Sequence, residues 1–323
     1  MSEPIYRPIL KDALRHTFRH PSLWILGILA SFLGHLGAAE LITRAADVAT
    51  GQPLMRAAFG YTTGAFSPLA DFLGGPTMKD TLVLVFIFLL AVILLVAFIY
   101  ASVTGQAALI SAAHKLNFSK QYSFRAAWRQ GSEHFWPVFS LNLLRRLVTV
   151  FLMILLVLPW WSLAPGAVGS RPWIFAPVFI IVAVVSILIS FMIFFAICSV
   201  VLEKRPLATA LKDAWQMLIK HWLASFEVAV ILFALDLVIL LATAVSFLLV
   251  AYPFYFLTVL FSSIGAQALL SFLLVVSLLV YAIIIAIVNG IAMTFEMLTW
   301  VGVWNQFRQG HIVSKVLRFF YHP

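Results

Sequence analysis

The feature that most constrains this chain is the length of its uncharged runs. From Leu237 to Phe295, 59 consecutive residues contain no Asp, Glu, Lys or Arg, and the run Thr81–Ala113 extends for 33 residues. About 20 apolar residues of helix suffice to cross the hydrocarbon core of a bilayer. Over the whole chain 63% of residues are hydrophobic and 10% are charged, against about 45–50% and about 25% in soluble domains. An all-α integral membrane protein with several spans is therefore predicted.

Six apolar segments are predicted to cross the membrane. They are Leu23–Ile42, Thr81–Ala113, Phe135–Leu158, Trp173–Leu202, about Trp222–Tyr252 and about Ala266–Phe307. The last two divide the 59-residue run, and Pro253 followed by Ser262–Gly265 marks the turn expected between them. The first segment, with basic residues before it, also resembles a secretory signal cleaved near Ala39. A retained span is the favoured interpretation, because the residues before it recur inside the chain.

A short cassette occurs three times, each time just before a long apolar run. It reads LKDALRHTFRH at 10–20, FRAAWRQGSEH at 124–134 and LKDAWQMLIKH at 211–221. Apolar residues gather on one helical face and polar residues on the other, which is typical of a helix lying in a membrane surface. We therefore predict a single membrane domain over 1–323, built from three parallel repeats of a cytoplasmic surface helix, a span out and a span back. The repeats cover approximately 8–114, 120–203 and 206–307, and a basic tail follows at 308–323.

The distribution of Lys and Arg predicts the orientation of the chain. Fifteen of these residues lie beside the cassettes and in the tail, whereas four lie in the opposite segments. Because cytoplasmic loops are enriched in basic residues, both termini are predicted to be cytoplasmic and the protein to lie in the cytoplasmic membrane, with the 43–79 loop outside. The net charge of +9 follows from this topology, so nucleic acid is not an expected partner.

Basic residues of the cassettes are predicted to contact anionic lipid headgroups on the cytoplasmic side. They are Lys11, Arg15, Arg125, Arg129 and Lys212. Each Lys or Arg near an anionic surface contributes about 1 kcal/mol of attraction. Membrane lipids are therefore the expected partners, with a protein partner or a second copy of the chain as alternatives.

Five charged residues are predicted to form a polar network inside the membrane. They are Arg145, Arg146, Glu227, Asp236 and Glu296. Asp236 falls near the middle of the fifth span, where an unpaired carboxylate is expensive by a few kcal/mol or more. Aligning the second and third cassettes places Arg145 about 6 Å nearer the cytoplasm than Asp236, which predicts an ion pair with Arg145 or Arg146. A coupled ion pathway or headgroup groove is one interpretation, and a buried pair that fixes helix register is the preferred one.

Asp12, His16 and His20 are spaced i, i+4 and i+8 on one polar helix face, a spacing that suits the edge of a metal site. The later cassettes keep only the final histidine, and no Cys or carboxylate cluster supplies further ligands. A solvated helix face is the preferred interpretation, and no metal or other cofactor is expected. No nucleophile elbow or phosphate-binding glycine loop occurs in the sequence, so no catalytic residue is predicted.

Two stretches carry a resemblance to a known group of membrane proteins. In GQAALISAAHKLNFSKQYSFRAAWRQGSEHFWPVF a helix end, a basic loop and a cassette lead into the next span, and VVLEKRPLATALKDAWQMLIKHWLASFEV is its counterpart. The pattern resembles the membrane domain attached to some bacterial glycerophosphoryl diester phosphodiesterases, and similar stand-alone six-helix proteins. The resemblance implies a six-helix membrane fold. The hydrolytic domain of those enzymes lies outside the membrane portion and has no counterpart here, so no phosphodiesterase site is implied.

The function expected from the sequence is non-enzymatic: binding or moving lipids or another membrane-soluble molecule. One alternative is an ion-coupled secondary transporter that uses Arg145 and Asp236. Another is a scaffold or assembly subunit of a membrane complex. A water-accessible cavity reaching Asp236 would favour transport, whereas closely packed spans without such a cavity would favour a scaffold.

Overall fold

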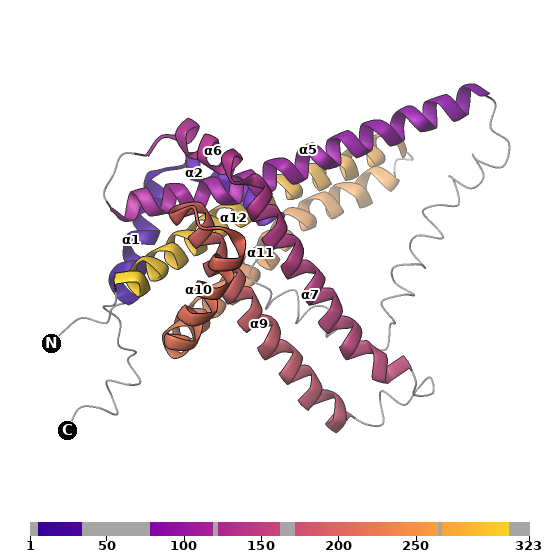
Figure 1. Ribbon diagram of the computed structural model, residues 1–323. Coiled ribbons are helices and arrows are strands. Elements are labelled where there is room, and N and C mark those ends of the chain that lie inside the picture. Colours follow the sequence, from indigo (N-terminus) through magenta and orange to yellow (C-terminus); the bar gives the residue numbers. More distant parts are fainter. Residues whose placement is uncertain (1–5, 34–77, 119–121, 162–171, 264–266, 310–323) are drawn as a thin grey trace. The chain divides into compact units, whose positions relative to one another are not determined.

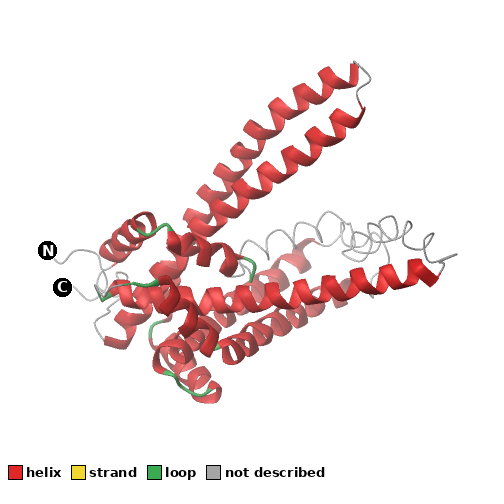
Figure 2. Cartoon of the chain, turned by 90° about the horizontal axis from the view of Figure 1, so that it is seen from above, coloured by secondary structure: helices red, strands yellow, loops and turns green. Residues whose placement is uncertain are grey.

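The computed structural model describes residues 6–33, 78–118, 122–161, 172–263 and 267–309 (Figure 1). Regular structure over these residues is entirely helical (Figure 2), which confirms the all-α prediction. The helices are α1 (Tyr6–Arg19), α2 (Ser22–Ser31), α5 (Met78–Asn117), α6 (Phe124–Glu133), α7 (Phe135–Trp161), α9 (Pro172–Glu203), α10 (Leu207–Lys220), α11 (Trp222–Ser263) and α12 (Gln267–Gln309).

Five of the described helices are long and apolar enough to cross a membrane, as expected for a multi-pass membrane protein. The qualifying segments are Val85–Asn117, Phe135–Leu152, Ile180–Glu203, Trp222–Leu241 and Val275–Gln309. The shorter apolar helix α2 covers the beginning of the first predicted span. Most of the remainder of that span, residues 43–77 of the predicted loop and nearly all of the basic tail lie outside the described residues, while residues 78 and 79 begin α5. Six spans therefore stay a prediction.

The turn predicted at Pro253 is wrong. Helix α11 continues through Pro253 to Ser263, and α12 begins at Gln267. Proline removes one backbone N–H from a helix, but apolar membrane helices tolerate it because local adjustments satisfy the freed carbonyl group. At about 1.5 Å per residue α11 is about 63 Å long, about twice the thickness of a hydrocarbon core. The helix must therefore tilt or extend beyond the core.

Each cassette forms a helix that ends at its final histidine. Helix α6 stops before His134 and α10 before His221, whose φ angles of −106° and −125° leave the helical range. Helix α1 stops before His20, and Pro21 then precedes α2. The next helix begins one or two residues after each histidine. All three cassettes are therefore helical, while their position in a membrane surface and the three parallel repeats stay predictions.

The chain divides into two compact units. Unit 1 contains Met1–Leu33, Val103–Val138 and Phe194–Pro323, and unit 2 contains Gly34–Ser102 and Phe139–Ile193. The core of unit 1 includes an aromatic cluster in which the Phe195 ring centroid lies 6.2 Å from that of Trp300 and 5.9 Å from that of Phe307. In unit 2, the large apolar side chains of the first part of α5 are mostly exposed, as lipid-facing residues would be.

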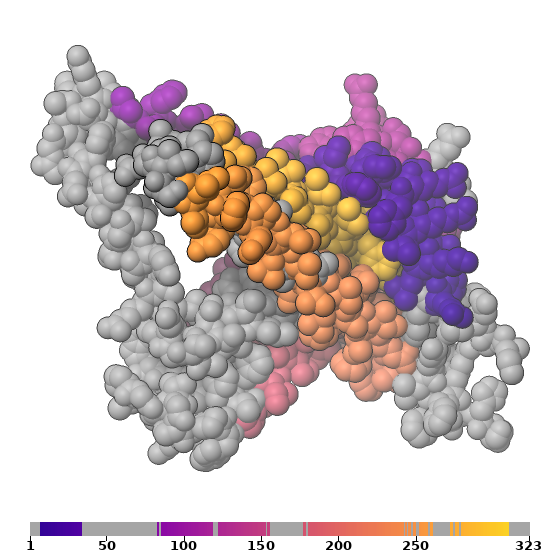
Figure 3. All heavy atoms as spheres, turned by 180° about the vertical axis from the view of Figure 1, so that it is seen from behind, coloured from indigo at the N-terminus to yellow at the C-terminus, as the bar shows by residue number. Residues whose placement is uncertain are grey.

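A close crossing of α2 and α12 organises unit 1. A Cβ atom at Gly27 would lie 2.1 Å from the carbonyl oxygen of Gly290, so only glycine permits this approach. Next to it the Thr294 hydroxyl donates to the carbonyl of Leu23 at 3.2 Å. Figure 3 shows the indigo segment that contains α1 and α2 lying against the yellow end of α12. The crossing thereby holds α1 beside the last turns of α12.

Candidate functional site

The five residues of the predicted intramembrane network lie in different units. Arg145 and Arg146 belong to α7 in unit 2, while Glu227 and Asp236 on α11 and Glu296 on α12 belong to unit 1. Glu296 is buried, with 3% of its surface exposed, and Arg146 is exposed. The other three residues are half-buried. The ion pair between Asp236 and either arginine stays a prediction.

The five predicted headgroup contacts are all exposed on the surface helices. They are Lys11 and Arg15 on α1, Arg125 and Arg129 on α6, and Lys212 on α10. The same helices bury the alanine that each cassette carries at its fourth position: Ala13, Ala127 and Ala214. The basic residues are therefore exposed, with Arg129 3.8 Å from Glu133 in an ion pair, while the small residues pack against the protein.

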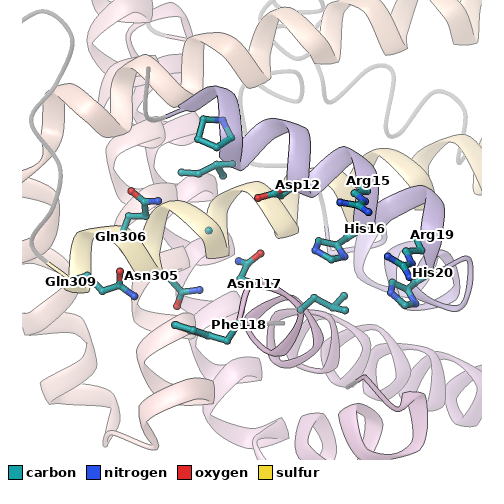
Figure 4. Close-up of a pocket in the computed structure, with 14 residues that line it drawn as sticks. Asp12, Arg15, His16, Arg19, His20, Asn117, Phe118, Asn305, Gln306 and Gln309 are labelled. Atoms are coloured by element: carbon teal, nitrogen blue, oxygen red, sulfur yellow. The ribbon is translucent and has the colours of Figure 1, made fainter. Parts of the chain in front are cut away.

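One of these helices borders a polar cavity of about 730 Å³ (Figure 4). The cavity lies between α1, the end of α5 and the last turns of α12. Helix α1 contributes Asp12, Arg15, His16 and Arg19, with His20 directly after it. The end of α5 contributes Asn117, followed by Phe118, and α12 contributes Asn305, Gln306 and Gln309. In Figure 4, Asn117 lies between the ring and guanidinium groups of α1 and the amides of α12.

The amphipathic pattern of α1 determines which residues face the cavity. Ala13 and Thr17 are buried against the protein, and the indole Nε1–H of Trp24 donates to the Thr17 carbonyl at 2.8 Å, which links α2 to α1. A Cβ atom at Gly302 would lie 2.9 Å from Ile9 Cγ2, so the glycine lets α1 approach α12 closely. Because residues three or four apart share a helix face, Asp12, Arg15, His16 and Arg19 line up along the cavity.

A histidine of α5 holds Asn305 in place. The Nδ1–H of His114 donates to Asn305 Oδ1 at 2.9 Å. The His114 ring is itself enclosed by Phe118, with ring centroids 4.9 Å apart, and by Trp304 at 6.3 Å. Asn305 is only 7% exposed. Its amide is therefore held in a buried position, with the oxygen engaged and the nitrogen without a partner among the described residues.

Three buried nitrogen atoms of the cavity-lining residues have no hydrogen-bond partner among the described residues. They are Asn117 Nδ2, Asn305 Nδ2 and His16 Nδ1. Leaving a buried polar group unpaired costs about 1–3 kcal/mol. Both amide nitrogens are donors, but each is almost inaccessible to solvent, so a ligand with acceptor oxygens would reach them only after a small shift of the surrounding side chains.

The electrostatics of the cavity favour an anion. The lining residues include two arginines, Arg15 and Arg19, and a single carboxylate, that of Asp12. The His16 and His20 rings are stacked with centroids 6.2 Å apart. Burial, and next the charge of His20, lower the pKa of His16 below its ordinary value, and the two arginines act in the same direction. Even with neutral histidines, the arginines leave a net positive charge beside the unpaired donors.

A metal ion does not suit these residues. Among the described residues, no three His, Cys, Asp or Glu side chains are grouped as metal ligands would be. Asp12, His16 and His20, which have the spacing of a metal edge in the sequence, share the cavity with two arginines. Nearby positive charge opposes the binding of a cation.

The cavity was not predicted from the sequence. Arg15 was predicted as a headgroup contact, and Asp12, His16 and His20 were interpreted as part of a solvated helix face. Asn117, Asn305, Gln306 and Gln309 were not selected. The adjacent Asn305 and Gln306 follow a long apolar stretch of α12, and that abrupt change in polarity was the available signal.

Comparison with known proteins identifies a family but no characterised relative. The sequence profile of DUF7544, a family of unknown function, matches residues 11–298. Neither a curated protein nor a solved structure matches the chain. The resemblance to the membrane domain of the phosphodiesterases therefore receives no support from these comparisons. The match contains α6, α10 and all of α1 from Lys11 onward, whereas Asn305, Gln306 and Gln309 lie beyond it.

Proposed function

The chain belongs to DUF7544, a family of unknown function, and from its geometry we propose that it is a non-enzymatic membrane protein that binds the headgroup of an anionic lipid. The cavity beside α1 is the binding site. One observation carries the proposal: Arg15 and Arg19, with Asp12 as the single carboxylate, line a cavity that the amide residues Asn117 and Asn305 also line. Arginine and amide donors together suit the acceptor oxygens of a phosphate group.

The position of the cavity supports a lipid as the ligand. Asn117 and Gln309 are the last residues of two helices that are apolar enough to span a membrane, so the cavity lies where a span ends. Helix α1 also exposes apolar side chains, Leu14 at 51% and Phe18 at 58%. An amphipathic helix of this kind lies at the boundary between headgroups and acyl chains. A lipid headgroup could then enter the cavity while its chains remain in the membrane.

The proposal includes a specific topology. Six spans in three parallel repeats would place both termini in the cytoplasm and the cavity at the inner leaflet of the cytoplasmic membrane. The helix breaks at His20, His134 and His221 support equivalent repeats, and the bias in Lys and Arg supports the orientation. The inner leaflet is the side on which anionic lipids give a negative surface potential.

Ion-coupled transport has less support than lipid binding. Asp236, the residue on which a coupled pathway would depend, does not line this cavity. Movement of a lipid across the membrane would require a second accessible state, whereas binding requires only the described arrangement. Lipid binding is also compatible with a protein partner or a second copy elsewhere on the surface.

A matched pair of double variants tests the proposal. Arg15→Ala with Arg19→Ala removes two cationic groups from the cavity, and Arg125→Ala with Arg129→Ala removes two with the same spacing from α6. Hydrogen bonds to charged groups contribute about 1.5–3 kcal/mol each. The α1 variant should therefore bind anionic lipid about 100-fold more weakly, or worse, in titrations of the detergent-purified protein. The α6 variant should change the affinity only slightly.

The comparison separates a defined site from general attraction to a charged surface. Equal losses in the two double variants would mean that only surface charge matters, and the cavity would then not be the site. No measurable affinity of the unaltered protein for anionic lipid would refute the function itself. Thermal unfolding of all three proteins establishes that they are folded.

A further inference from the structure

The cavity has two chemically different sides. The α1 side carries Arg15, Arg19, His16 and His20, whereas the side formed by the ends of α5 and α12 is neutral and rich in amides. Asn117, Asn305, Gln306 and Gln309 together offer both N–H donors and carbonyl acceptors. A ligand with only anionic groups would leave the carbonyl acceptors of the amide side without hydrogen-bond donors. The lining is therefore suited to a ligand with one anionic end and one neutral polar end.

The size of the cavity also leaves room for more than an inorganic anion. Its volume of about 730 Å³ lies within the range of about 300–1,000 Å³ in which proteins enclose whole small molecules. A phosphate group would occupy a small part of it, because one water molecule takes about 30 Å³ in the liquid. A ring with several substituents fits the remaining space better than a bare phosphate does.

The arginines indicate which end of the ligand lies on which side. Asn117 and Gln309 terminate α5 and α12, and α1 ends at Arg19, so the cavity lies at three helix C-termini. Helix C-termini carry partial negative charge and free carbonyl groups, and only the α1 side has cationic side chains to offset that charge for a phosphate. Hydroxyl groups suit the amide side, since each donates one hydrogen bond to a carbonyl and accepts others from amides. The anionic end is then left to Arg15 and Arg19.

We propose that the ligand is a polyol phosphate, a sugar or cyclitol carrying a phosphate group, bound with its phosphate at Arg15 and Arg19 and its hydroxyls at Asn117, Asn305 and Gln306. The lipid-linked form of this ligand rests on the proposed function. In that form the phosphate joins the polyol to the diacylglycerol. The free sugar or cyclitol phosphate has the same recognition chemistry, and only the contribution of the acyl chains distinguishes the two sources.

A lipid series with identical acyl chains tests the neutral side of the site. Phosphatidylinositol supplies the polyol, whereas phosphatidylserine and phosphatidic acid are anionic without it. The full-length protein in detergent should bind phosphatidylinositol at least about tenfold more tightly than the other two, the factor expected from one or two additional hydrogen bonds of ordinary strength. Equal affinities for all three lipids would overturn the polyol assignment while leaving anionic lipid binding intact.

Two variants locate the recognition. Asn117→Leu and Gln306→Leu remove amide donors at positions that are half-buried, so folding should persist. Each variant should weaken the binding of phosphatidylinositol severalfold more than the binding of phosphatidic acid, so the preference for phosphatidylinositol should fall. A preference that survives in both variants would overturn the assignment, and so would an equal loss of affinity for every lipid.

A soluble competitor separates the two sources of the headgroup. Inositol 1-phosphate should displace phosphatidylinositol only at concentrations at least about 100-fold higher, because it lacks the buried acyl chains. If the soluble compound binds as tightly as the lipid, the polyol phosphate assignment holds and the lipid part of the proposed function fails. If neither compound binds and anionic lipids do, the polyol assignment alone fails.

Discussion

The Gly27→Ala substitution should destabilise unit 1 by separating α2 from α12. The added Cβ would lie 2.1 Å from the Gly290 carbonyl oxygen and 2.4 Å from Thr294 Oγ1, whereas ordinary contact begins at 3.4 Å. The nearest atom belongs to the backbone, so no side chain can rotate away. The helices must therefore move apart by about 1 Å.

The expected cost follows from what that movement disrupts. Forcing extra volume into a packed core costs about 1–3 kcal/mol. The Thr294 hydroxyl would keep its shorter hydrogen bond, to the Gly290 carbonyl at 2.7 Å, so no further loss is expected there. Relative to a Gly→Ala control with the same gain in helix propensity, about 1–3 kcal/mol corresponds to a fall of about 2–12 °C in the unfolding temperature, on the scale of soluble domains of 150–250 residues.

Thermal unfolding of the detergent-purified protein measures this effect, with Gly302→Ala as the control. At Gly302 the nearest atom to the new Cβ is Ile9 Cγ2 at 2.9 Å, the end of a side chain that can shift. Both substitutions gain about 1 kcal/mol of helix propensity. The difference between their unfolding temperatures therefore measures the steric cost at the crossing of α2 and α12. Equal unfolding temperatures for the two variants would refute the reasoning, as would a greater loss in Gly302→Ala.

Three further predictions concern protonation, an ion pair and topology. Because burial lowers the pKa of His16 below 6.5, the folded state takes up protons less readily than the unfolded state. The unfolding temperature should therefore fall as the pH drops from 7.5 to 5.5. His16→Gln should make that fall smaller, and a fall of the same size in the variant would contradict this role of His16. Arg308 donates to Glu203 Oε2 at 2.5 Å and lies 5.6 Å from the Trp304 ring centroid. Arg308→Ala should therefore lower the free energy of unfolding by about 1 kcal/mol, and by less at high salt. Denaturant titrations at two salt concentrations measure this, and equal free energies of unfolding for the variant and the unaltered protein would show that the pair is unimportant. Reporter fusions at residues 60, 165 and 265 should all signal from outside the cytoplasm, and a cytoplasmic signal at any one would reject the six-span topology.

Hydropathy was sufficient to identify the helices, because a helix is one of the few structures that satisfies every backbone polar group in hydrocarbon. The prediction of Thr81–Ala113 as one helix agrees with α5, which extends a few residues further at each end. The three surface helices and their histidine ends also follow from local pattern. Pro253 was misread as a turn, because proline ends helices more readily in water than in an apolar environment.

The cavity was decided by tertiary structure. Arg15, Asn117 and Asn305 are far apart in the sequence, and no local period relates a neutral amide on one helix to an arginine on another. They come together because α2 crosses α12 at Gly27 and α1 packs on α12 at Gly302. The sequence by itself determined that the chain is helical, suited to spanning a membrane and basic beside its surface helices. Which polar residues share a cavity, and which of their nitrogens lack a partner, depended on how those helices pack, since burial and hydrogen bonding are properties of neighbours in space.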